Sequence, residues 1–142
     1  MTPINKQTIQ AKLVLLEKNI TLLRSYQQIS KKVFLEDYTV QGAAMHYLVE
    51  SIEIIVNIGN HILAEQFGQA ESTYKDIILS LGKHKIIPNR FAQQHATMTD
   101  FRNLIIHGYA EVKLMEVYKA VQSGPSIFER FSRYFVRYIE KK

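Results

Sequence analysis

Apolar residues recur at alternating steps of four and three near the start of the chain, and this spacing constrains the fold more than any other feature. The step is kept by Ile9, Leu13, Leu16, Ile20 and Leu23. Such residues share one face of an amphipathic helix, which here begins near Asn5. No segment alternates apolar and polar residues convincingly as a half-buried strand would, and no repeat has a solenoid period. The sequence therefore predicts an all-α fold.

Five further helical segments follow from the same periodicity and from helix-ending residues. A long helix is predicted from about Thr39 to Phe67, and a shorter one from about Ser72 to Leu81, with Ser72 as N-cap and Gly82 as the stop. The next is predicted to run unbroken from Pro88 to His107 and to end at Gly108. A short helix over residues 114–121, a turn at "QSGPS" and a last helix from about Pro125 complete the chain. We expect a bundle of five to six helices with short connections.

Length and composition indicate one compact domain over residues 1–142. The chain has 142 residues, 46% of them hydrophobic, and no cysteine. This length suits a domain with its own core, and the lack of cysteine excludes disulfides and thiolate metal sites. The first residues lack the apolar core of a signal peptide, and no window reaches the roughly 18 apolar residues of a membrane span. We therefore expect a soluble, cytoplasmic protein.

The net charge of +5 is segregated along the sequence. Residues 1–32 carry six Lys or Arg and one Glu, residues 33–74 carry six acids and no base, and residues 75–142 carry twelve bases and six acids. A polyanion would therefore meet the two ends of the chain rather than its middle. Ordinary surface charge is the alternative interpretation.

An arginine interrupts the apolar stripe of the helix predicted before Gly108. Arg102 lies within roughly 20° to 40° of the Met98 and Ile105 directions on a helical wheel. An unpaired buried guanidinium is too costly to persist, so Arg102 must face a partner charge, a wet cleft or another subunit.

Polar side chains gather around Arg102 at the end of the same helix. Asn103 and His107 are four residues apart and share a face, and Tyr109 follows the glycine. Arginine offers a fork of donors to phosphate oxygens, and histidine titrates near neutral pH, so the set suits a phosphodiester. The alternative for His107 alone is a helix-terminal histidine that satisfies a carbonyl.

Two further polar stripes have both a functional and a structural interpretation. The long second helix carries His46, Glu50, Glu53, Asn57 and Asn60 at steps of four and three, with His61 next to them. This stripe is either a solvated face or a wall of a cleft beside Arg102. The last helix carries Arg130, Arg133, Arg137 and Lys141. That basic stripe either binds a nucleic-acid backbone or forms an outer face in water.

Motifs for metals, nucleotides and hydrolysis are missing. None of the five histidines has a Glu three residues before it, and HExxH, GxGxxG, the P-loop and GxSxG do not occur. Helical di-iron sites use Glu-x-x-His pairs, so the sequence predicts no metal and no cofactor.

The spacing Arg102, four residues, His107, one residue, Tyr109 resembles the Arg-x4-His-x-Tyr signature of HEPN-domain toxins of the HepT-like family. Two more segments resemble that family, "SIEIIVNIGNHILAE" around Asn60 and His61 and "TYKDIILSLGKHKIIP" before the motif helix. The order of elements agrees from about Gln41 to Ile139, and the motif itself shows no departure.

The resemblance implies a HEPN-like homodimer whose two motif helices line a shared cleft. It further implies a metal-independent endoribonuclease toxin that cleaves tRNA or mRNA. Arg102 would bind the scissile phosphate, His107 would act as general acid or base in attack by the ribose 2′-OH, and Asn103 would orient them. Glu53, Asn57, Asn60 and His61 would line the cleft.

The family's usual partner is a minimal nucleotidyltransferase antitoxin that inactivates the toxin by AMPylation of the motif tyrosine. Tyr109 is the matching position in this sequence. Two alternatives stay open. The protein could be a non-catalytic substrate- or nucleotide-binding subunit of a nucleotidyltransferase complex, or a structural helical dimer in which Arg102 satisfies an interface carboxylate.

Overall fold

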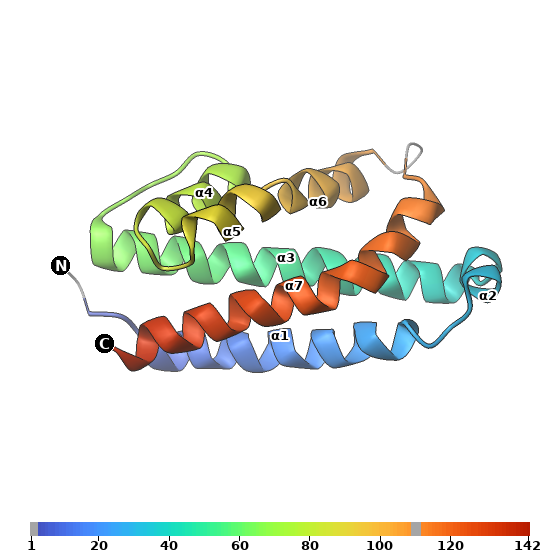
Figure 1. Ribbon diagram of the computed structural model, residues 1–142, viewed down its shortest axis with the longest axis horizontal. Helices are drawn as coiled ribbons and strands as arrows, with labels where there is room; N and C mark the ends of the chain where they lie inside the picture. The colour runs from blue at the N-terminus through green and yellow to red at the C-terminus, as the bar shows by residue number, and fades with distance from the viewer. Residues whose placement is uncertain (1–2, 109–111) are drawn as a thin grey trace.

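Helices alone make up the regular structure of this computed structural model, which describes residues 3–108 and 112–142. Over these residues the helices are α1 (Lys6–Tyr26), α2 (Lys31–Glu36), α3 (Tyr38–Phe67), α4 (Tyr74–Lys83), α5 (Asn89–His95), α6 (Met98–His107) and α7 (Leu114–Glu140). The long helices α1, α3 and α7 pack on one another, while α4, α5 and α6 form a second row along α3 (Figure 1). The predicted all-α class is confirmed.

The core lies between the three long helices. All five residues of the predicted α1 stripe are buried, and so are Leu48, Ile52, Ile55 and Ile62 of α3. The aromatic face of α7 closes the core with Phe128, Phe131 and Phe135. Burial of such a side chain contributes roughly 1.5–3 kcal/mol to the stability of the fold. The apolar stripes predicted from the sequence are therefore the residues that stabilise the core.

Helix α4 starts and ends at positions that differ slightly from the prediction. Its N-cap is Thr73 rather than Ser72, and the Thr73 hydroxyl accepts a hydrogen bond from the backbone N–H of Asp76 at 3.1 Å. Gly82 lies inside the helix, and Lys85 takes the left-handed conformation, with φ of 59°. A Cβ on Gly82 would approach the Ala92 Cβ to 2.6 Å, so this glycine permits the close packing of α4 on α5.

The helix predicted from Pro88 to His107 is broken at Ala96 and Thr97, which separates α5 from α6. The Thr99 hydroxyl donates to the Ala96 carbonyl at 2.9 Å. Threonine hydroxyls compete in this way with helical hydrogen bonds, and the apolar periodicity does not register that competition. The end of α6 at His107, with Gly108 as C-cap, agrees with the prediction, although Gly108 has φ of −129° and is not left-handed.

The turn predicted at "QSGPS" is wrong, because α7 continues through it with Pro125 inside the helix. Proline has no N–H, so the carbonyl four residues earlier, that of Val121, loses its helical donor. The side-chain amide of Gln27, which follows α1, donates to this carbonyl at 3.1 Å and to that of Gln122 at 3.2 Å. A contact across 94 residues therefore carries the helix past its proline, and Figure 1 shows α7 bending in its first half.

Two further findings concern the whole set of described residues. The short helix α2, capped by Ser30, was not predicted, because its six residues are too few for a periodic signal. Within residues 3–108 and 112–142, no helix is long and apolar enough to cross a membrane.

Candidate functional site

Arg102 lies where α6 crosses α3, with its guanidinium enclosed by three partners. One Nη donates to a Glu53 carboxylate oxygen of α3 at 3.3 Å, and the other donates to the Asn103 amide oxygen at 3.0 Å. The guanidinium carbon lies 4.7 Å from the centre of the Tyr74 ring at the start of α4, a cation–π distance. The partner charge that the sequence required is Glu53.

The environment of Arg102 is only partly dry. The Arg102 side chain is 16% exposed and the Glu53 side chain is 37% exposed. The Arg102 Nε is buried and has no hydrogen-bond partner among the described residues. A buried guanidinium donor without an acceptor is a group that the oxygen of a phosphate entering the site can satisfy.

The other motif residues lie on the outer side of α6. Asn103 and His107 are both exposed, and His107 has no hydrogen bond or ion pair within the described part of the chain. His107 is therefore free to reach a ligand at the C-terminal end of α6. Tyr109, the residue matched to the AMPylation position, lies outside the described residues.

The polar stripe of α3 is divided between two neighbours. Glu50 accepts a hydrogen bond from the Asn19 amide of α1 at 2.8 Å and lies 3.7 Å from the His46 imidazole. Glu53 alone turns to Arg102. Only part of the stripe therefore forms a wall beside the arginine.

The three remaining residues predicted to line a cleft make no hydrogen bond or ion pair with Arg102 among the described residues. Asn57 and Asn60 are exposed, and His61 is half-buried with its Nε2 atom buried and unpartnered within the described residues. They continue the α3 face away from Glu53, so their part in a cleft stays a prediction.

Tyr74 is the residue near Arg102 that the sequence did not single out for chemistry. It lies in the segment "TYKDIILSLGKHKIIP", and its position at the first turn of α4 brings its ring beneath the guanidinium. An aromatic at a helix start gives no periodic signal of its own, so only the family resemblance of that segment pointed to it.

A groove is lined by residues of α3 and α6. Its volume is about 380 Å³ and its lining includes Met45, Val49, Ile105 and Ile106. Tyr38, at the rim, is 87% exposed. An apolar groove directly beside the motif helix is the kind of surface that a partner chain covers.

Acidic and histidine side chains do not gather into a metal-binding group. Over the described residues, no cluster of three or more His, Asp or Glu could hold an ion. The chemistry available at the end of α6 is that of a guanidinium, an amide and an imidazole.

Comparison with known proteins places the chain in a family. Residues 16–135 match the family model described as Ribonuclease HepT-like. A tRNA nuclease HepT from Aphanizomenon flos-aquae (strain 2012/KM1/D3) is 23% identical over 98% of this chain and 95% of its own. An mRNA nuclease HepT from Shewanella oneidensis is 25% identical over 83% of this chain and 92% of its own.

Solved structures share the fold. The tri-AMPylated HEPN toxin of Shewanella oneidensis, solved in complex with an MNT antitoxin, superposes with a TM-score of 0.82, covering 91% of this chain and 96% of its own at 23% identity. The cytosolic protein YutE of Bacillus subtilis, of unknown function, gives a TM-score of 0.86 over 99% of this chain and 94% of its own at 18% identity. The family model spans most of the sequence, including the Arg-x4-His-x-Tyr motif, and this chain belongs to the HepT-like ribonuclease family.

Proposed function

We propose that this protein is the ribonuclease toxin of a toxin–antitoxin pair, acting on tRNA or mRNA in the cytoplasm. The observation that carries the proposal is the half-buried guanidinium of Arg102, with a free Nε, on the helix that ends at the exposed His107. Membership in the HepT-like family and two relatives named as RNA nucleases support it.

The proposed reaction is transesterification within the RNA strand. The ribose 2′-oxygen attacks the adjacent phosphorus and loses its proton to a base, while the bond from phosphorus to the 5′-oxygen breaks and that oxygen gains a proton. The products are a 2′,3′-cyclic phosphate and a free 5′-hydroxyl. His107 transfers one of these protons, Arg102 stabilises the charge on the phosphate oxygens, and Asn103 orients the pair.

Glu53 gives the free protein a resting state. Its carboxylate holds the Arg102 guanidinium 3.3 Å away in the absence of substrate. Glu53 occupies only one Nη, whereas the two non-bridging oxygens of a scissile phosphate can accept from two guanidinium donors at once, so the phosphate competes with Glu53 for the arginine. The Tyr74 ring keeps the guanidinium plane in place during this exchange.

The proposed active form is a homodimer whose motif helices line a shared cleft. The apolar groove of α3 and α6, with Met45 and Ile106 in its lining, supports this assembly. Met45→Asp should convert the dimer to a monomer in light scattering, whereas Val14→Asp, on the exposed face of α1, should not. A dimer that survives Met45→Asp would exclude this groove as the interface.

The proposed off switch is AMPylation of Tyr109 by a partner nucleotidyltransferase. The phenol oxygen attacks the α-phosphorus of ATP, pyrophosphate leaves, and the adduct adds negative charge two residues after His107. That phosphate would compete with RNA for Arg102. Mass spectrometry after incubation with the cognate transferase and ATP should find the adduct on the wild type and not on Tyr109→Phe.

The deciding experiment is RNA cleavage by purified protein. Arg102→Ala and His107→Ala should each reduce cleavage by about 10²-fold or more with the helical content retained. Arg90→Ala, which removes an exposed arginine on α5, should leave cleavage intact. An oligonucleotide with 2′-deoxyribose at the cleavage position should resist the wild type. Cleavage that persists in both motif variants would refute the assignment. If the wild type binds nucleotides and cuts no RNA, the protein is a binding subunit instead.

A further inference from the structure

A basic cleft lies between the connection from α4 to α5 and the last turns of α7. Its volume is about 530 Å³, and it is lined by Lys83, Lys85, Arg137 and Lys141 together with Tyr134, Tyr138 and Asn89. No acidic side chain belongs to the lining. Four cations without a counter-charge form a local field that favours a polyanion.

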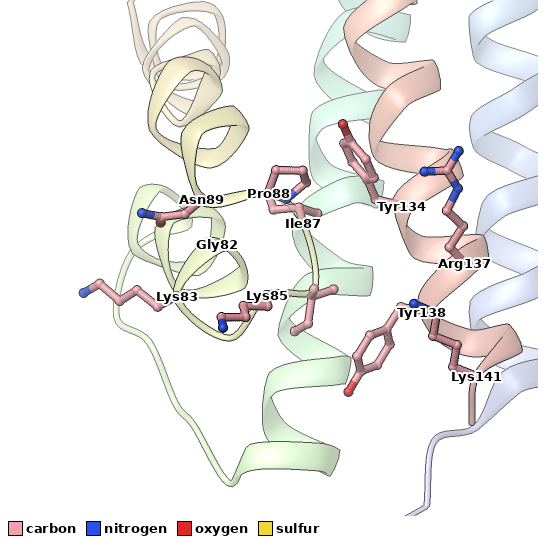
Figure 2. A pocket seen from close by; sticks show the side chains of 11 residues that line it. Gly82, Lys83, Lys85, Ile87, Pro88, Asn89, Tyr134, Arg137, Tyr138 and Lys141 are labelled. Atoms are coloured by element: carbon pink, nitrogen blue, oxygen red, sulfur yellow. The ribbon is translucent and has the colours of Figure 1, made fainter.

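The side chains of the cleft are arranged as two basic walls with aromatic rings between them. Figure 2 shows Tyr134 and Tyr138 projecting from α7 toward the α4–α5 connection, with Arg137 and Lys141 on the α7 side; Lys83 and Lys85 lie on the other side, with their ammonium groups directed outward from the rings. A groove of positive charge with interleaved aromatics is how proteins hold single-stranded nucleic acid, with phosphates on the cations and bases on the rings.

One donor in the cleft has no partner. The Tyr138 hydroxyl is buried without a hydrogen-bond partner among the described residues. Burial raises the pKa of this phenol above its ordinary value, so the group is protonated at neutral pH and available as a donor. An acceptor supplied by a ligand, such as a phosphate or base oxygen, would satisfy it.

The basic track extends along α7 beyond the cleft. Arg130, Arg133, Tyr134 and Arg137 line a smaller hollow next to it, of about 80 Å³. From Arg130 to Lys141 the axial rise is roughly 16 Å, enough for several nucleotides of a strand. Arg130 is the least available of these cations, because it stacks on the Phe91 ring at 4.3 Å and donates to the Tyr134 hydroxyl.

The cleft is separate from the candidate active site. In Figure 1 the α4–α5 connection and the end of α7 lie at the end of the molecule that holds both chain termini, whereas α6 ends toward the opposite side. An RNA strand held here therefore does not occupy the position of the scissile phosphate.

We propose that the cleft between the α4–α5 connection and the end of α7 is a second RNA-binding site, which holds single-stranded RNA apart from the Arg102–His107 motif. The ligand class rests on the proposed ribonuclease function, while binding itself is independent of cleavage. The cations and the Tyr138 hydroxyl would also suit an acidic protein, but rings set among cations favour the stacked bases of single-stranded RNA.

The test is fluorescence anisotropy of a labelled single-stranded RNA at several salt concentrations, in the His107→Ala background so that the probe stays intact. Arg137→Ala with Lys141→Ala should raise the Kd and lower the slope of log K against log salt by about 1.4, since each phosphate contact on a single strand contributes about 0.7. Lys31→Ala with Lys32→Ala removes the same charge from the exposed start of α2 and should change neither quantity. Tyr138→Phe should weaken binding and leave the slope as it is, because the hydroxyl is neutral.

A Kd and a salt slope equal to those of the wild type in the Arg137/Lys141 double variant would overturn the proposal. If that variant also lost binding to a protein partner, the cleft would be a protein-docking surface instead. Unchanged affinity in Tyr138→Phe would remove the hydroxyl from the site. Failure of the ribonuclease assignment is distinguishable, because it would appear as absent cleavage by the wild type while the salt dependence of RNA binding still changed in the double variant.

Discussion

Replacing Glu53 by glutamine should destabilise the protein more than replacing Arg102 by methionine. The two residues form one ion pair, but their side chains are exposed to different degrees. The Glu53 side chain is 37% exposed, and the Arg102 side chain is 16% exposed. After Glu53→Gln the guanidinium keeps its charge in a site where it is poorly hydrated. After Arg102→Met the carboxylate is rehydrated, and methionine suits the surrounding apolar stripe.

The magnitudes follow from this asymmetry. Hydrogen bonds to charged groups contribute about 1.5–3 kcal/mol, and a glutamine oxygen keeps part of that, so Glu53→Gln should lower the free energy of unfolding by about 1–2 kcal/mol. Arg102→Met should lower it by less than about 1 kcal/mol, as for an exposed pair. The same Arg102→Met change should reduce RNA cleavage by about 10²–10³-fold, the usual loss when one charge-stabilising donor is removed.

Urea denaturation of both single variants and of the Glu53→Gln/Arg102→Met double variant measures these terms. The unfolding free energy of the double variant should be close to that of Arg102→Met alone, because no unpaired guanidinium remains in the site. The slope of the unfolding free energy against urea concentration should be the same in all three variants. A larger loss for Arg102→Met than for Glu53→Gln would refute the reasoning. It would show that the arginine serves the packing of α6 on α3 rather than a ligand.

Three more perturbations test the fold. Gln27→Leu should lower the unfolding free energy by about 1–3 kcal/mol, because it leaves the Val121 carbonyl without a donor. The loss should be smaller in a Pro125→Ala background, where a backbone N–H is restored, and an equal loss in both backgrounds would contradict this. Gly82→Ala should cost about 1–3 kcal/mol through overpacking against α5, seen as a lower Tm, and an unchanged Tm would contradict it. Burial and the charge of Arg130 lower the pKa of His95. The unfolded state therefore binds more protons than the folded state below about pH 6.5, and stability falls as the pH is lowered. His95→Gln should make the fall in Tm between pH 7.5 and 5.5 smaller, and Tm curves parallel to those of the wild type would contradict this.

The sequence predicted those parts of the fold that depend on periodicity over several turns. The stripes of α1 and α3 are buried as expected, and α3 ends at Phe67 as expected. The error at residues 122–126 arises where one long-range contact outweighs a local signal. "QSGPS" has the composition of a turn, and nothing near it in sequence indicates that a glutamine 94 residues away supplies the missing donor.

The candidate site was predictable in part for a related reason. The position of Arg102 on the helical wheel predicted a partner charge but did not indicate which acid of the long helix supplies it. In the structure that acid is Glu53, while Glu50 accepts a hydrogen bond from Asn19 of α1. Tyr74, Lys83 and Lys85 are brought next to their partners in the site and in the cleft only by tertiary packing. The basic stripe of α7 was visible in the sequence, while the opposite wall that turns it into a cleft was not.

The bridge from Gln27 to the Val121 carbonyl also bears on the order in which the chain assembles. A peptide covering residues 114–140 has no such donor, so in isolation it should populate two short helices separated at the proline. We therefore expect the continuous helix to form only after the end of α1 has docked, late in folding, because that contact closes a large loop. A fragment of α7 would keep the cations that follow Pro125, but it would lack the opposite side of the cleft, to which Lys83 and Lys85 belong in the intact protein.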